Sequence, residues 1–276
     1  MRHPSSFPGK FRLRINNSTQ PADARAIWMA ARQPGIKPVA VKTEAQQAVL
    51  AMHRVRQQLV KNRTAQRNEL RGLLTEYGEV FGLGRAAFNA GMKGALARLE
   101  ERLPATLIDT MREQWDELAR LDERIARIEA RLLAWLRQDR ATQAIAAIPG
   151  VGLLTATAAV ATMGQAESFR SGREFAAWIG LVPAQTGTGG KVKLLGISKR
   201  GDIYLRTLLI HGARAVLAKT NAPSPWLQEL GKRRPPNVVI VALANKMART
   251  IWAVLAHGRA FDKEHVSVRP NMAAPT

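Results

Sequence analysis

AIAAIPGVGLLTATAAVAT, from Ala144 to Thr162, places two apolar helical segments on either side of a short turn that contains proline and glycine. Glycine lets the backbone turn with a positive φ angle, and the second helix can begin directly after the turn. This pattern predicts a helix-hairpin-helix in which Gly150, Val151 and Gly152 bring a DNA phosphate to the free N–H groups of the second helix. The alternative is an ordinary helix–helix turn that needs glycine for close packing.

The segment before this turn carries the periodicity of long amphipathic helices. Residues 44–77 contain no proline, and their apolar residues Val49, Met52, Val55 and Leu59 recur at steps of three and four, so one helix is predicted there. The glycine-containing stretch 78–94 interrupts the pattern, and a second helix is expected from near Pro104. Its apolar positions are Leu107, Met111, Trp115, Leu118, Leu121, Ile125, Ile128, Leu132 and Trp135. The two helices form either an intramolecular hairpin or a dimer-forming coiled coil.

The fold class expected from these patterns is mainly α. Residues 1–40 are predicted to be largely irregular apart from a short helix at Ala24–Arg32, and residues 41–140 to form a long antiparallel helical arm. Residues 141–260 form a C-terminal helical domain, because small apolar residues and basic charges dominate from Ala141 onward. Residues 261–276 are predicted to be a disordered tail.

The charge of the chain favours a polyanionic partner. The 42 lysines and arginines exceed the 21 acids by a net +21, and a field of this size attracts nucleic acid. We find no long apolar span and no signal peptide, so a cytoplasmic, nucleoid-associated protein is expected. The chain has no cysteine, which excludes disulfides and thiol catalysis.

Further candidates lie after residue 168. The aromatic residues between Phe169 and Leu181 have helical spacing, which favours a role in the core. The loop TGTGGK, Thr186–Lys191, lacks the spacing of a nucleotide-binding P-loop. It is either a flexible, hydroxyl-bearing loop that closes on DNA or an ordinary turn. Asp202 is expected to cap a following helix. The predicted DNA contacts outside the turn are Lys191, Lys193, Ser198, Lys199, Arg200, Arg206 and Arg214, of which the two last should lie off the buried face of that helix and clamp phosphates.

Four segments together carry a family resemblance that extends from Ala22 to about Ala260. They are KTEAQQAVLAMHRVRQQLVKNRTAQRNELRGLL (Lys42–Leu74), IPGVGLLTA (Ile148–Ala156), FAAWIGLVP (Phe175–Pro183) and GGKVKLLGISKRGDIYLRTLLIHGAR (Gly189–Arg214). With these, the chain resembles insertion-sequence transposases that join an N-terminal RuvC-like DEDD domain to a C-terminal serine-type transposase domain and are related to Piv-type invertases.

The resemblance implies a set of active-site residues that this chain matches only in part. In the family, four carboxylates hold a divalent metal, Mg²⁺, and a serine in the glycine-rich loop attacks a phosphodiester. Of the D-x-x-D pair this sequence keeps Asp23, since Gln20 stands at the other acid position, and the first two acids are expected upstream of Met1. The serine region holds Thr186 and Thr188, which become the candidate nucleophiles.

The resemblance also implies partners: DNA, an element-encoded guide RNA, and a second copy of the chain bound through the arm. On this basis we expect an insertion-sequence transposase, N-terminally truncated and catalytically impaired. One alternative is a DNA- or RNA-binding and oligomerising module without chemistry. Another is a structure-specific DNA-binding protein that uses the helix-hairpin-helix.

Overall fold

The computed structural model describes residues 20–33, 41–187, 191, 193–220 and 223–263. The chain divides into two compact units, Met1–Ala40 and Val41–Thr276. In the first unit, α1 spans Gln20–Arg32, so this helix begins four residues before the predicted Ala24. The predicted disordered tail falls mostly outside the described residues.

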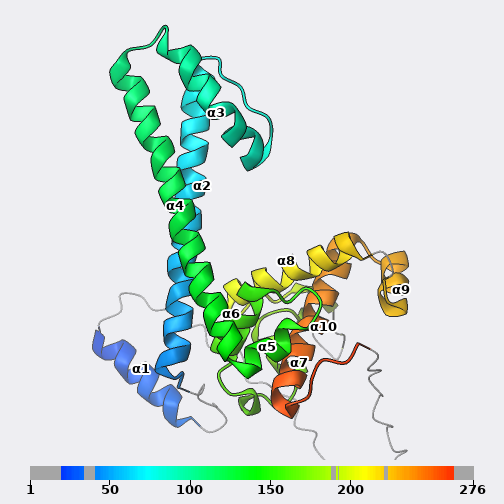
Figure 1. Cartoon of the computed structure of the whole chain (residues 1–276). Helices are drawn as coiled ribbons and strands as arrows, with labels where there is room; N and C mark the ends of the chain where they lie inside the picture. Colours follow the sequence, from blue (N-terminus) through cyan, green and yellow to red (C-terminus); the bar gives the residue numbers. More distant parts are fainter. Residues whose placement is uncertain (1–19, 34–40, 188–190, 192, 221–222, 264–276) are drawn as a thin grey trace, which may run out of the picture. The chain divides into compact units, whose positions relative to one another are not determined.

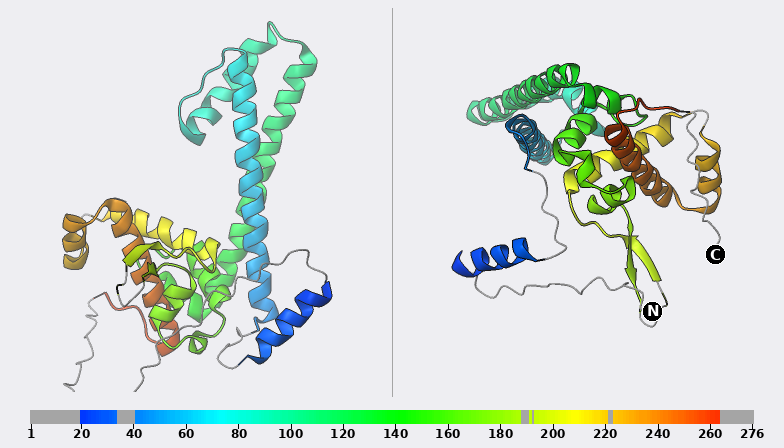
Figure 2. Two further views of the ribbon diagram at one scale, coloured as in Figure 1. Left: turned by 180° about the vertical axis from the view of Figure 1, so that it is seen from behind. Right: turned by 90° about the horizontal axis from the view of Figure 1, so that it is seen from below.

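The arm consists of two long helices in the second unit, α2 (Glu44–Glu76) and α4 (Ala105–Gln138), which lie side by side in every view (Figures 1 and 2). Thr43 starts α2 with a capping box, in which its hydroxyl accepts from the Gln46 N–H and the Gln46 side chain accepts from the Thr43 N–H. Cross-contacts pair Arg56 with Glu129 and Arg63 with Asp122. Later residues of α2 therefore meet earlier residues of α4, and the helices are antiparallel.

The apolar stripe of α4 is buried within the chain. Its buried members are Ile108, Met111, Leu118, Leu121, Ile125, Ile128 and Leu132. They pack against α2 residues such as Val49, Leu59 and Leu70. The intramolecular hairpin, one of the two alternatives for the arm, is thus the arrangement observed. One predicted stripe residue was wrong, because the side chain of Val55 is 50% exposed.

A third helix, α3 (Gly84–Glu100), lies where the sequence predicted an interruption. The loop is limited to the residues just before it, and the chain is helical again from Gly84 despite Gly91 and Gly94. The reason is tertiary packing: Phe88 and Met92 are fully buried, and the Phe88 ring meets Trp115 of α4 edge to face. Burial of these side chains outweighs the low helix propensity of the glycines.

The C-terminal domain is built around α6 (Leu153–Met163), nine of whose eleven residues are buried. The surrounding elements are α5 (Arg140–Ala146), η1 (Ala166–Ser168), α7 (Gly172–Trp178), α8 (Ile203–Lys219), α9 (Pro225–Arg233) and α10 (Pro236–His257). One antiparallel pair of strands, β1 (Pro183–Thr186) and β2 (Lys193–Ile197), completes it. The described chain is mainly α, as predicted, and Phe175 is fully buried in the core as expected.

Among the described helices, α10 is long and apolar enough to cross a membrane by length and composition, with a mean hydropathy of 1.6 over 18 residues. The prediction that the chain has no long apolar span was therefore wrong at α10. Its Val239, Met247, Ile251 and Val254 side chains are buried, and the helix packs against α7 and α8. These contacts are those of a core helix, which passes the same compositional test.

Candidate nucleic-acid interface

The residues on either side of the glycine-rich segment form a β-hairpin, and the predicted loop between them lies largely outside the described residues. β1 and β2 pair antiparallel, with Pro183 opposite Ile197 and Thr186 opposite Lys193, and a bulge interrupts the ladder near the start of β1. Opposed residues of an antiparallel pair carry neighbouring side chains. The hydroxyl of Thr186 and the ammonium group of Lys193 therefore belong to the same end of the hairpin.

The hairpin is fixed at its base by a close crossing of two backbone segments. Gly180 (φ 82°) and Gly201 (φ 72°) both have left-handed backbone conformations. A Cβ on Gly201 would come within 1.7 Å of the Trp178 carbonyl oxygen, and a Cβ on Gly180 within 2.2 Å of the Arg200 carbonyl oxygen. Only glycine fits at either position. The Lys199 N–H donates to the Gly180 carbonyl and completes the crossing.

Arg206 of α8 locks this crossing from inside the domain. Its Nη1 donates to the carbonyl oxygens of Ile179 and Arg200, each at 2.7 Å, and the residue is only 7% exposed. The prediction that Arg206 lies off the buried face of α8 was therefore wrong. Because Arg206 is one turn after the Asp202 cap, its side chain reaches back to the two carbonyls that the sharp turn leaves without helical partners. The arginine positions the hairpin.

Asn245 of α10 is a second anchor, and the sequence did not point to it. Its Nδ2 donates to the Leu181 carbonyl at 3.2 Å, just before β1. The predicted cap at Asp202 is confirmed, since its carboxylate accepts from the Leu205 N–H at 2.8 Å and starts α8. The hairpin base is thus held by α7, α8 and α10 together.

Most of the predicted cationic contacts are exposed around this anchored base. Lys191, Lys193, Lys199 and Arg200 are exposed on the hairpin and its C-terminal end, and Arg214 is exposed in the C-terminal half of α8. Ser198 is half-buried, and its N–H donates to the Val182 carbonyl, so its backbone belongs to the hairpin base. The exposed side chains are free to meet phosphates from solvent.

The turn between α5 and α6 has a packing role in this structure. Gly150 (φ 84°) faces α8, where a Cβ would meet the Gly212 carbonyl at 2.9 Å, and a Cβ on Gly212 would meet the Gly150 carbonyl at 2.1 Å. Val151 is buried at 4% exposure. Gly152, the exposed N-cap of α6, has no side-chain cap. The alternative interpretation, a glycine turn needed for close packing, accounts for Gly150. At Gly152 the backbone N–H groups of the helix start have no side-chain cap.

The candidate catalytic residues belong to different parts of the chain. Thr186 is exposed in β1, Thr188 lies outside the described residues, and Asp23 lies in the first turn of α1 in the other unit. Within the described ranges no three His, Cys, Asp or Glu side chains gather closely enough to hold a metal ion. The donor set that Mg²⁺ needs is therefore not met by these residues, and we derive no step through a metal.

A buried histidine joins the arm to the domain that carries the hairpin. His53 of α2 is 1% exposed, and its ring nitrogens lie 2.9 Å from the hydroxyls of Thr157 on α6 and Tyr204 on α8. The Thr157 hydroxyl donates to the Leu153 carbonyl, so it accepts from His53 Nε2, and Nδ1 accepts from Tyr204. Burial and then the charge of Arg56 lower the pKa of His53 to about 4, which keeps the ring neutral.

These features define a class: a mainly helical protein with a strongly basic surface hairpin on a rigid base. Comparison with known proteins identifies the family within this class. Residues 142–229, which include the hairpin and its base, match the model of the transposase IS116/IS110/IS902 family.

Three relatives extend the match across the arm. The chain is 52% identical over 239 residues to a probable family 20 transposase of Pseudomonas aeruginosa, covering 85% of this chain and 71% of the relative. It is 43% identical to the transposase for insertion sequence element IS1111A of Coxiella burnetii, with 87% and 67% covered. It is 37% identical to the transposase for IS1328 of Yersinia enterocolitica, with 90% and 75% covered. The chain belongs to the IS116/IS110/IS902 family of transposases.

Proposed function

We propose that this transposase acts on the DNA of an insertion sequence and that the β1–β2 hairpin is its DNA interface. The observation that carries the proposal is the locked hairpin base. Gly180, Gly201, Arg206 and Asn245 fix the backbone, while the cations next to them remain exposed. A rigid frame with free cations binds phosphates with little loss of conformational entropy on binding.

We further infer that a threonine hydroxyl of this hairpin replaces the serine of the family's C-terminal domain. The Thr186 oxygen would attack a DNA phosphorus, form a phosphoester to the protein, and release the displaced DNA oxygen as a hydroxyl that takes up the threonine's proton. The energy of the broken bond stays in the ester for rejoining. Lys193, opposite Thr186 in the ladder, supplies positive charge beside the phosphate. Thr188 is the second candidate for the nucleophile.

A covalent-adduct assay tests this chemistry. The chain is incubated with nicked DNA from an element end and run on a denaturing gel, with Thr186→Ala, Thr188→Ala and Thr186→Ser as variants. We expect an adduct that disappears in one alanine variant and persists in Thr186→Ser. An adduct that survives both alanine substitutions would rule out both threonines.

A non-catalytic DNA- or RNA-binding module is the second candidate function, and one observation favours it. The described residues offer no group of carboxylates for a metal, and threonine carries a methyl group that crowds attack. In this case DNA binding persists with a steep salt dependence, and no adduct forms with any DNA.

We propose four further properties of this protein. They are a relationship of residues 1–40 to a RuvC-like domain, a helix-hairpin-helix contact at Gly152, an element-encoded guide RNA, and a homo-oligomer. Because the α4 stripe is buried against α2, a dimer formed through the arm would use its charged outer faces. Sedimentation of the chain alone and with RNA tests the last two.

A further inference from the structure

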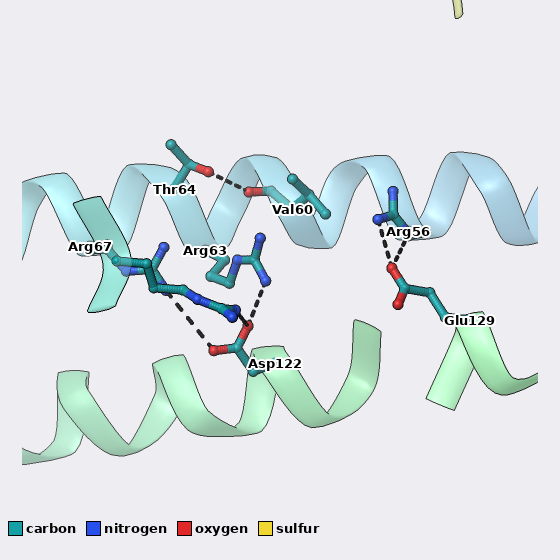
Figure 3. A network of polar contacts seen from close by, with 8 residues as sticks. Arg56, Val60, Arg63, Thr64, Arg67, Asp122 and Glu129 are labelled. Atoms are coloured by element: carbon teal, nitrogen blue, oxygen red, sulfur yellow. Dashed lines mark hydrogen bonds and ion pairs between the residues drawn. The ribbon is translucent and has the colours of Figure 1, made fainter. Parts of the chain in front are cut away.

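Three arginines of the arm converge on one carboxylate. Arg63 and Arg67, one turn apart on α2, point toward Asp122 of α4 (Figure 3). The Arg63 Nη1 lies 2.5 Å from Asp122 Oδ1, the Arg67 Nη2 lies 4.0 Å from Oδ2, and Arg85, in the first turn of α3, reaches Oδ1 at 3.5 Å. We call Arg63, Arg67 and Arg85 the arginine cluster.

Charge is not balanced in this cluster. Elsewhere on the same pair of helices, Arg56 meets Glu129 one to one at 2.6 Å. Around Asp122 three guanidinium groups share a single carboxylate, which leaves two positive charges in excess. The side chains of Arg63 and Arg67 are only 18% and 12% exposed, so solvent screens this excess poorly.

The hydrogen-bond donors are also unbalanced. The Nε–H groups of Arg63 and Arg67 are buried and have no acceptor among the described residues. The ion pair between Arg67 and Asp122 is 4.0 Å long, which is beyond hydrogen-bond distance. Arg71, one turn further along α2, differs: it donates to the carbonyls of Phe81, Gly82 and Gly84. The shortage of acceptors is therefore specific to the cluster.

The electrostatic balance at Arg67 agrees with this. Desolvation first, and then the charge of Arg63, lower its pKa, and the opposing effect of Asp122 is smaller than either. The group stays charged at neutral pH, but its surroundings favour the arrival of an anion. Arg85, whose side chain is 59% exposed, opens the cluster to solvent.

We propose that the arginine cluster binds a phosphate of a nucleic-acid backbone, which makes the arm a second nucleic-acid contact separate from the hairpin. Guanidinium groups bind phosphate oxygens with paired N–H donors, and the chain's net charge of +21 selects a polyanion over an acidic side chain of another protein. The inference rests on the proposed function in one respect: nucleic acid is the polyanion that a transposase meets. Asp122 then neutralises part of the arginines' charge in the free protein and competes with the phosphate.

The test compares two charge-matched pairs of variants in the full chain. Arg67→Gln and Asp122→Asn alter the cluster. Arg120→Gln and Glu117→Gln alter an exposed one-to-one pair, 3.3 Å long, on the same helix as Asp122. Binding to fluorescent duplexes of DNA and of RNA of equal length is followed by anisotropy over a range of NaCl concentrations. The two probes distinguish the sources of the phosphate.

Arg67→Gln is expected to weaken binding of at least one duplex about tenfold, the effect of one charge-assisted hydrogen bond, and to reduce the salt slope by about one. Arg120→Gln should change affinity less than about twofold. Asp122→Asn should tighten binding more than Glu117→Gln does, although it destabilises the free arm. A purely structural role for the cluster predicts no tighter binding by Asp122→Asn, because loss of Asp122 would then disturb folding with no gain in affinity.

Two results would overturn the proposal. One is that each cluster variant binds like its matched control. The other is that Arg67→Gln changes the oligomeric state in sedimentation and leaves nucleic-acid affinity unchanged, which would assign the cluster to a carboxylate of a second copy. The hairpin variant Lys193→Gln separates this outcome from failure of the proposed function, since it weakens binding if the hairpin contact is real, whatever the arm does.

Discussion

Helices pack against one another in different ways in the arm and in the C-terminal domain. In the arm, large side chains such as Leu132 and Ile125 fill the space between α2 and α4, and ion pairs line the edges. In the domain, small residues let backbones touch: Gly150 meets Gly212 between helices, and Gly201 meets the Trp178 carbonyl beneath the hairpin. The stability of the arm depends on the volume of its buried side chains and not on close contact between backbones. The domain depends on having no side chain at particular glycines.

The largest effect is expected at the hairpin base. Gly201→Ala puts a methyl group 1.7 Å from the Trp178 carbonyl at a φ of 72°, and strain together with the clash should lower the free energy of unfolding by about 3 to 5 kcal/mol. Urea unfolding measures this. The control is Gly196→Ala in β2, where nothing lies within 4 Å of the new Cβ. Equal effects of the two substitutions would refute the close crossing.

In the arm, side-chain volume should dominate. Leu132→Ala removes a fully buried side chain and is expected to cost about 2 to 4 kcal/mol in the free energy of unfolding. Its neighbour Leu133 is 36% exposed, and Leu133→Ala should cost under about 1 kcal/mol. Thermal unfolding followed by circular dichroism compares the two. A similar loss in both would mean that α4 is not packed on the face described.

The junction of the two regions should be sensitive to acid. The pKa of His53 is lowered from 6.5 to about 4 in the folded chain, so between these values the unfolded state binds more protons, and stability falls as the pH drops from 6.5 toward 4. The full contribution is on the order of 3 kcal/mol. It should appear as the difference between the unfolding free energies of the wild type and His53→Gln across this range.

His211, which is exposed on α8, supplies the control for the junction. His211→Gln should leave the pH dependence of the wild type in place. If His53→Gln instead follows the wild type at every pH, His53 does not become neutral on folding.

The smallest effect is a gain in stability within the arm. Gly72 is exposed near the C-terminal end of α2, and a Cβ there would meet nothing within 4 Å. Gly72→Ala should therefore stabilise the chain by about 0.5 to 1 kcal/mol through helix propensity. Gly150→Ala in the domain should do the reverse, because Gly212 stands in the way. Calorimetric melting temperatures compare the two variants. If Gly72→Ala and Gly150→Ala shift the melting temperature in the same direction, the two regions do not differ in their dependence on glycine.

The same contrast explains what could be predicted from the sequence. The arm follows from the spacing of its apolar residues, because one stripe of large side chains defines both a helix and its buried face. The α3 helix was missed because its glycines hide a packing signal carried by Phe88 and Met92. The turn at Gly150–Gly152 was located by its glycines, but which atoms approach it depends on distant segments.

The candidate site divides in the same way. The exposed cations Lys193, Lys199 and Arg200 could be chosen from charge alone. Arg206 could not be distinguished from them by sequence. Its role depends on the carbonyls of Ile179 and Arg200, which lie 27 and 6 residues earlier in the chain. Asn245, 64 residues from its partner Leu181, carries no local signal. The pairing of β1 with β2 was not predicted, because it joins strands on either side of a glycine-rich segment.

The measurement that tests the central claim most directly uses the absence of cysteine from the chain. A single cysteine is introduced by Lys193→Cys in the hairpin or by Glu167→Cys, an exposed control in η1, and each variant is mixed with DNA that carries a mixed disulfide tethered to a backbone phosphate, with which the cysteine thiol can exchange. A hairpin that lies on the DNA predicts a disulfide-linked complex with Lys193→Cys and none above background with Glu167→Cys. Equal cross-linking of the two, or none at position 193, would contradict it.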